Sequence, residues 1–300
     1  MKPKTRILRR TDATAYAMML PYLLLFLLLT VIPVIAAMGL SFTHFNMLEL
    51  PRFTGLENYV RLFLEDDIFP QVLKNTLIFA LLIGPVSYFL SFFIAWMISD
   101  FSRGIRSIFT LAFYLPALTG NLYVTWNYIF SGNRYGILNS VLLKLGIMTV
   151  PVQWLSDPKY MLMTLVVIQM WNSIGGVGFL TFIAGFQNTD RSLSEAAGID
   201  GVHNRWQELW YVTLPSMAPQ LMFSAVMQIS SCFSVGAAVQ ALCGSPTTNY
   251  AADTLLTYML DVGTVRFEMG YASTIAVFLF LLMLFTDFIV THLLKHYRTD

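Results

Sequence analysis

The stretch TAYAMMLPYLLLFLLLTVIPVIAAMGL, residues 14–40, contains no Asp, Glu, Lys or Arg. A helix needs about 20 apolar residues to cross the hydrocarbon core of a bilayer, so this run is long enough to span it. It is too long for the apolar core of a cleaved secretory signal, about 7–15 residues, and it lacks a convincing cleavage site. We therefore interpret residues 14–40 as an uncleaved first span that follows a short basic segment, residues 1–12.

Five further apolar runs of similar length follow along the chain. The 300 residues are 56% hydrophobic and only 12% charged, against roughly 25% charged in a soluble domain. Lipid offers no partner for unpaired backbone groups, and the alternation typical of membrane barrels is missing, so these runs should be helices. The sequence predicts an all-α membrane protein with one membrane domain, residues 13–300, and six transmembrane helices near 14–40, 76–99, 106–130, 160–184, 216–240 and 270–294.

The basic residues predict how these spans are oriented. If the amino terminus is cytoplasmic, the inner segments hold eleven Lys and Arg, whereas the longer outer segments hold seven. An excess of Lys and Arg is typical of cytoplasmic loops. Both termini are therefore predicted to be cytoplasmic, together with the loop between spans 4 and 5, residues 190–215.

Several classes of activity lack their sequence signals. No lysine directly follows a glycine, so the phosphate-binding loop GxxxxGK[ST] is absent, and neither GxSxG nor HExxH occurs. The two cysteines, Cys232 and Cys243, lack a spacing that suits a metal. Asp287 is the only carboxylate inside a predicted span, which is too little for an ion-coupled carrier. We expect no catalysis, no cofactor or metal in this chain, and no nucleic-acid partner at a net charge of +1.

The loop 190–215 contains the string EAAGIDG, residues 195–201, in a segment that favours helix. Ser192 and Glu195 fit a capping box, which predicts a helix that starts at Leu193. Small residues then leave a narrow surface that another protein can approach closely, and Gly201 permits a turn between two short helices.

The second half of the loop shows helical periodicity. Val202, Trp206, Leu209, Trp210 and Thr213 recur at steps of three and four, which predicts an apolar side packed on the ends of the protein's own spans. Pro215 and Pro219 should end this helix where span 5 begins. Asn204, Arg205, Gln207 and Glu208 are placed on the opposite side. Periodicity alone leaves open a surface helix that merely joins two spans.

Short motifs recur in order along the chain. They are FTGLENY (53–59) with NT (75–76), GILN (136–139), WLSDP (154–158), EAAGIDG (195–201) with TLP (213–215), and GYAS (270–273). Together they resemble the membrane subunits of binding-protein-dependent ABC importers, in particular the maltose-type branch for carbohydrate uptake. One departure is CGSP, residues 243–246, where such permeases often carry GGP.

The resemblance implies a multi-pass permease subunit in a bacterial or archaeal cytoplasmic membrane. It implies as partners a second, related permease chain, two cytoplasmic ABC ATPase subunits that hold ATP and Mg, and an extracytoplasmic solute-binding protein. In that family the short helix of the loop enters a cleft of the ATPase, so we refer to residues 190–215 as the coupling loop. The residues expected to couple this chain to the ATPase are Glu195, Ala196, Ala197, Gly198, Asp200 and Gly201.

Polar residues inside spans 4 and 5 suggest a path for a solute. Gln220, Ser224, Gln228, Ser231 and Ser234 form a polar stripe on span 5, and hydroxyl, amide and aromatic side chains suit neutral sugars. The candidate pathway residues are Trp171, Asn172, Ser173, Gln228, Ser231 and Ser234. The same residue types also hold membrane helices together, so that alternative stays open.

Two other functions are also compatible with the sequence. One is an ABC permease for a non-sugar solute, such as glycerol phosphate or a polyamine. The other is a membrane sensor or scaffold that transports nothing.

Overall fold

The computed structural model describes residues 10–118 and 123–295, and the chain divides into two compact units. The first contains Met1–Leu64 and Val262–Val277, and the second contains Glu65–Asp261 and Phe278–Asp300. The last helix, α16 (Met269–Lys295), contributes residues to both units.

The first unit begins with an unbroken helical run and continues into a small hairpin. α1 (Arg10–Phe26), η1 (Leu27–Val31) and α2 (Ile32–Leu40) follow one another without a gap. β1 (Thr43–His44) then pairs antiparallel with β2 (Arg52–Phe53), a minor exception to the predicted all-α fold. α3 (Glu57–Val60) and η2 (Arg61–Glu65) follow, and η5 (Asp261–Val265) leads into α16.

Residues within and beside the FTGLENY and GYAS motifs hold the first unit together. The Asn58 amide donates to the carbonyl oxygens of Ser41 and Thr43, at 3.0 and 2.9 Å. Arg61 forms an ion pair of 2.6 Å with Glu268. A Cβ on Gly270 would lie 2.0 Å from the Thr43 carbonyl oxygen, so the chain passes here only with glycine. These motif residues are explained by packing within the unit.

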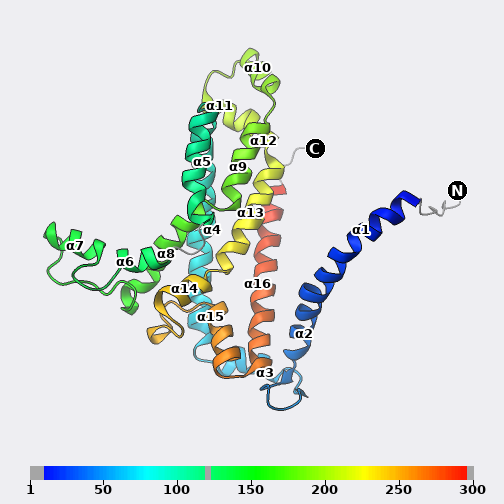
Figure 1. Ribbon diagram of the computed structural model, residues 1–300, viewed down its shortest axis with the longest axis vertical. Coiled ribbons are helices and arrows are strands. Elements are labelled where there is room, and N and C mark those ends of the chain that lie inside the picture. Colours follow the sequence, from blue (N-terminus) through cyan, green and yellow to red (C-terminus); the bar gives the residue numbers. More distant parts are fainter. Residues whose placement is uncertain (1–9, 119–122, 296–300) are drawn as a thin grey trace. The chain divides into compact units, whose positions relative to one another are not determined.

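The second unit holds the remaining helices, with α4, α5, α9 and α13 side by side (Figure 1). The long elements are α4 (Phe69–Ser99), α5 (Arg103–Leu118), α8 (Pro158–Ile174), α9 (Val177–Asn188) and α13 (Ala218–Phe233). The shorter ones are α6 (Tyr123–Ile129), α7 (Ile137–Lys144), α10 (Arg191–Ile199), α11 (Arg205–Glu208), η3 (Leu209–Thr213), α12 (Leu214–Ser216), α14 (Gly236–Cys243), η4 (Thr248–Tyr250) and α15 (Leu255–Leu260).

Five of the six predicted spans correspond to helical segments that are long and apolar enough to cross a bilayer. These segments are Tyr16–Leu40, Phe69–Ser99, Pro158–Asn188, Ala218–Cys243 and Met269–Leu293. The predicted third span, 106–130, falls on α5, on residues 119–122, which lie outside the described residues, and on α6. The third crossing therefore stays a prediction.

Among the described residues, the core of the second unit includes two apolar clusters at different positions along α4. One includes Phe79 of α4, Met161 and Leu165 of α8, and Val239 of α14, all buried. The other includes Ala95 and Ile98 of α4, Phe179 and Phe182 of α9, and Met217. Because lipid is as apolar as these side chains, close packing rather than exclusion of water holds the helices together.

Candidate functional site

Span 4 is interrupted near its middle. α8 ends at Ile174 and α9 starts at Val177, with Gly176 in an extended conformation (φ −72°, ψ −169°). A Cβ on Gly175 would lie 1.8 Å from the Phe113 carbonyl oxygen of α5, so the two backbones approach this closely only because the residue is glycine. The sequence predicts one continuous helix over 160–184, whereas the structure has two. Two adjacent glycines, each costing about 1 kcal/mol in a helix, favour the break.

Serines of neighbouring helices bond to the backbone around this break. Ser91 of α4 donates its hydroxyl proton to the Ile174 carbonyl oxygen at 2.7 Å, and Ser224 of α13 donates to the Gly178 carbonyl oxygen at 2.8 Å. A broken helix is stable at membrane depth only when its freed backbone groups find partners. The buried serines of spans 2 and 5 therefore stabilise the break in span 4.

Span 5 is interrupted as well. α13 ends at Phe233 and α14 starts at Gly236, with Ser234 near φ −92° and ψ 10°. A Cβ on Gly236 would lie 3.0 Å from the Leu256 side chain, so the small residue lets α15 approach closely. Irregular backbone inside a membrane occurs where it is buried in protein or lines a cavity.

Two of the predicted pathway residues meet beside the break in span 4. The Gln228 side-chain amide donates to the Ser173 hydroxyl oxygen and so links α13 to α8. Gln228 is only 7% exposed. Asn172 makes a longer contact, 3.4 Å, from its amide to the Gln169 side-chain oxygen. In this conformation Ser173 and Gln228 connect two spans.

The other three predicted pathway residues lie on an open surface. Trp171 is 58% exposed, and its ring lies edge-on to that of Trp126 at 6.5 Å. Ser231 and Ser234 are exposed, and the Ser234 hydroxyl donates to the Ser230 carbonyl oxygen at 2.9 Å. The polar stripe of span 5 thus runs from the interior of the unit, at buried Ser224, to its surface.

The first half of the coupling loop is α10, which projects past the ends of α5 and α9 (Figure 1). The predicted start at Leu193 and the capping box of Ser192 with Glu195 are wrong. The helix starts two residues earlier, because the Asp190 carboxylate accepts the Ser192 backbone N–H at 3.0 Å. The pKa of the Asp190 carboxyl is lowered by hydrogen bonds from Ser192. The bond from the Ser192 backbone has the largest effect, and the bond from its side chain comes next.

The predicted coupling residues lie on this half of the loop and face outward. Five are exposed and one is half-buried: Glu195, Ala196, Gly198, Asp200 and Gly201 are exposed, and Ala197 is half-buried. Ile199 beside them is 88% exposed. Gly201 has φ +96°, so the predicted turn is confirmed in a conformation that other residues rarely adopt.

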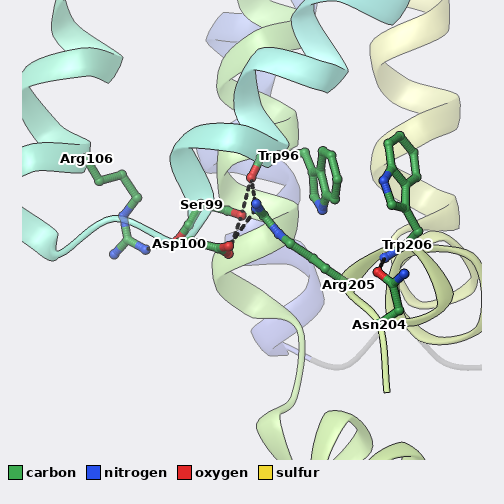
Figure 2. A network of polar contacts seen from close by, with 7 residues as sticks. All are labelled: Trp96, Ser99, Asp100, Arg106, Asn204, Arg205 and Trp206. Carbon is green, nitrogen blue, oxygen red and sulfur yellow. Dashed lines mark hydrogen bonds and ion pairs between the residues drawn. The ribbon is translucent and has the colours of Figure 1, made fainter. Parts of the chain in front are cut away.

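The second half of the coupling loop is fixed to the end of α4, as Figure 2 shows. The Arg205 guanidinium donates to the Trp96 carbonyl oxygen at 2.6 Å and pairs with the Asp100 carboxylate at 2.8 Å. It also lies 4.2 Å from the centre of the Trp96 ring, and the Trp206 ring is 4.8 Å from the same ring. We call the contacts of Arg205 with Trp96 and Asp100 the Arg205 clamp.

The Arg205 clamp satisfies a helix end. The last four carbonyl groups of a helix have no partner inside it. Arg205 bonds to the Trp96 carbonyl oxygen, and Arg106 of α5 donates to that of Ser99 at 3.3 Å. Cations at this end are also favoured by the helix dipole. Two arginines from different elements therefore cap α4.

The predicted arrangement of the second half is only partly confirmed. Leu209 is buried, as expected for the apolar side, but Trp206 and Trp210 are more than half exposed. Arg205, placed by periodicity on the outer side, instead turns toward α4. The helix starts at Arg205 because the Asn204 side chain accepts the Trp206 backbone N–H at 3.0 Å.

Sequence reasoning missed Trp96 and Asp100, which lie at the end of α4, far along the chain from Arg205 in the coupling loop. The residues joined by the hydrogen bond of Arg205 are 109 positions apart, and no local pattern pairs them. The asparagines of the recurring motifs prove to be structural: Asn75 donates to the carbonyl oxygens of Tyr250 and Asp253, and Asn139 to that of Val152. Within the described residues, no group of three or more His, Cys, Asp or Glu could hold a metal ion.

Comparison with known proteins gives a consistent picture. Residues 13–299 match the family model described as binding-protein-dependent transport system inner membrane component. The chain is 32% identical to the probable ABC transporter permease protein YesP of Bacillus subtilis (strain 168), over 91% of this chain and 87% of that protein. It is 29% identical to the arabinooligosaccharides transport system permease protein AraP of the same organism, over 92% of this chain and 87% of the relative.

A solved structure shares the fold. The bacterial alginate ABC transporter in complex with an alginate pentasaccharide-bound periplasmic protein contains a chain that matches with a TM-score of 0.76. The match covers 94% of both chains at 24% identity. At this identity the likeness concerns the fold alone.

Proposed function

This chain belongs to the family of binding-protein-dependent transport system inner membrane components, and on that premise we propose that it is the permease subunit of an ATP-driven importer for oligosaccharides. The match over residues 13–299 carries this proposal. In this family the ATPase is a separate subunit, which agrees with the absence of a phosphate-binding loop from the sequence. The oligosaccharide class is supported by the similarity to the arabinooligosaccharide permease.

The two interrupted spans are proposed to contain the solute site. Trp171, Ser231 and Ser234 present an aromatic ring and hydroxyl groups on an open surface. Asn172, Ser173 and Gln228 add amide and hydroxyl groups beside the break in span 4. Such groups match the hydroxyls and apolar ring faces of a neutral sugar.

The coupling loop is proposed to transmit the motion of a partner ATPase. Its exposed half, with Glu195, Ala196, Ala197, Gly198, Asp200 and Gly201, is free to enter a cleft in another subunit. The Arg205 clamp connects the second half to α4 in addition to the covalent links with α9 and α13. A displacement of α10 would then reach three spans at once.

The assembly proposed around this chain has the composition implied by the family. It contains a second permease chain, two ATPase subunits and an extracytoplasmic binding protein, in the cytoplasmic membrane of a bacterium or archaeon. The amino terminus and the coupling loop face the cytoplasm in this proposal, because the basic residues of the sequence are concentrated on that side.

Reconstitution tests the proposal directly. The complex that copurifies with this chain is placed in vesicles with its binding protein, and uptake of labelled oligosaccharides, glycerol phosphate and polyamines is measured with and without ATP. We expect ATP-dependent uptake of an oligosaccharide. Uptake of only glycerol phosphate or a polyamine would replace the proposed substrate class, and copurification without any ATPase subunit would contradict the transport function.

A further inference from the structure

A large cavity lies in the second unit between α5, α9 and the coupling loop. Its volume is about 1140 Å³, above the roughly 300–1,000 Å³ of common small-molecule sites. Its walls include the end of α4, Gln187 of α9, and Ser194 and Glu208 of the coupling loop. Because Ser194 belongs to α10, the cavity extends as far as the exposed half of that loop.

One side of α5 lines this cavity with polar groups. Arg103, Ser107, Thr110 and Tyr114 are separated by four, three and four positions, so they lie on one side of the helix, and all four line the cavity. Other sides carry apolar residues, such as Ile105 and Ile108, which are exposed. Polar side chains of a membrane helix are costly toward lipid and are found facing a water-filled space or protein.

The cavity reaches the break in span 4. The twelve residues from Arg103 to Tyr114 extend about 16 Å along α5, roughly half of a hydrocarbon core of about 30 Å. The Cα of Tyr114 would lie 3.5 Å from a Cβ on Gly175. The polar side of α5 therefore leads from the predicted cytoplasmic end of the spans to the level of the break.

The charges on the walls are largely balanced. Three arginines, Arg103, Arg106 and Arg205, share the cavity with the carboxylates of Asp100 and Glu208. Arg106 and Arg205 already bond to carbonyl oxygens at the end of α4. This balance suits a neutral solute better than a multiply charged one.

We propose that this cavity is the inner part of the solute pathway, an exit vestibule for a neutral, hydroxyl-rich solute. Ser107, Thr110 and Tyr114 of α5 and Gln187 of α9 are the side chains that face the solute. Their hydroxyl and amide groups both donate and accept hydrogen bonds, and the Tyr114 ring can pack on a sugar face. The inference rests on the proposed transport function and adds α5 to a pathway that sequence analysis confined to spans 4 and 5.

Thiol chemistry on the assembled complex tests the vestibule. Thr110→Cys places a thiol on the cavity side of α5, and the matched control Ile108→Cys places one on another side of the same helix. The unsubstituted chain, with its own Cys232 and Cys243, is the blank. In lipid nanodiscs, a membrane-impermeant thiol reagent should modify Thr110→Cys at least tenfold faster than Ile108→Cys. After reconstitution into vesicles, modified Thr110→Cys should lose at least nine-tenths of its ATP-dependent uptake.

The modification follows assembly, so a loss of uptake cannot come from failed folding. Equal modification rates for the two variants, or unchanged uptake by modified Thr110→Cys, would overturn the inference. Failure of the proposed function looks different, because the unmodified complex would then take up no oligosaccharide.

Discussion

The two halves of the coupling loop differ in how they are held. α10 is exposed along most of its length, with the Asp190 cap at its start and the turn at Gly201 after its end. The second half is attached to α4 by the Arg205 clamp, by the contact of Trp206 with Trp96, and by the burial of Leu209. One half is thus available to a partner and the other is joined to the spans.

This difference suggests that the two halves of the 26-residue coupling loop have different roles. A surface that binds another subunit must keep its side chains free, whereas a lever must be rigidly joined to what it moves. Gly201 lies between the two halves, with a φ of +96° and no atom within 4 Å of the place where a Cβ would lie. The following predictions concern substitutions that disturb one half of the coupling loop while leaving the other half intact.

The largest effect is expected from Arg205→Ala. The substitution removes the ion pair, one cap of α4 and the contact of the guanidinium with the Trp96 ring, so α10 would be coupled to α4 only through the weaker contacts of Trp206 and Leu209. Arg205 is 38% exposed, and we expect a stability loss of only about 1 kcal/mol. Uptake in vesicles should fall at least tenfold while ATP hydrolysis continues.

Arg52→Ala is the matched control, because Arg52 forms an exposed pair with Glu49 at 3.2 Å, far along the chain from the loop. It should leave uptake within twofold of the parent. Normal uptake by Arg205→Ala would show that α4 is not driven through this contact.

Gly201→Val should have the next largest effect. A β-branched residue at φ +96° costs about 1–3 kcal/mol and would displace α10 relative to the clamped half. Gly146→Val is the control, because Gly146 also has a positive φ, +70°, with nothing near its Cβ position, but lies outside the loop. We expect a several-fold lower uptake for Gly201→Val alone, and equal uptake by both variants would argue against the turn.

Asp100→Asn should have a moderate effect. It keeps an oxygen that can accept from Arg205 but removes the negative charge, and exposed pairs of this kind contribute about 0.2–1 kcal/mol. Uptake should fall two- to threefold. A double-mutant cycle with Arg205→Lys measures the coupling between the two residues, and strictly additive effects would mean that Asp100 is not part of the clamp.

The smallest effect is expected at the Asp190 cap. Because the folded pKa of this carboxyl is lowered, its contribution to the helix is complete above the ordinary carboxyl pKa, about 3.9. It is lost as pH falls through the lowered folded value. Hydrogen exchange of the first amides of α10 should therefore lose protection only in acid. Asp190→Asn, which cannot titrate, should show no such additional change.

The sequence predicted the spans well because composition alone decides whether a helix can lie in lipid. Residues 14–40 and 270–294 are apolar enough that no tertiary contact is needed to place them. The breaks in spans 4 and 5 were harder to predict. Gly175 and Gly176 favour an interruption, but its position depends on the Phe113 backbone and on Ser91, which come from other helices.

The candidate site was predicted unevenly for the same reason. The residues proposed to couple this chain to an ATPase come from a local string, and the turn at Gly201 follows from the freedom of glycine. The Arg205 clamp does not, because it joins the coupling loop to the end of α4, and periodicity assigned Arg205 to the wrong side. Within the described residues, the missed contacts are those that local patterns do not encode.

The bond between Gln228 and Ser173 has a consequence for how a sugar could be held. The Gln228 amide has two N–H groups, and one of them already donates to a hydroxyl of the neighbouring helix. A sugar hydroxyl that binds Gln228 in place of Ser173 therefore acts as a competitor, and it loosens α13 from α8 in the same event. Binding of the solute and separation of α13 from α8 would then be the same event. The solute itself would release the contact between the two spans that it must pass.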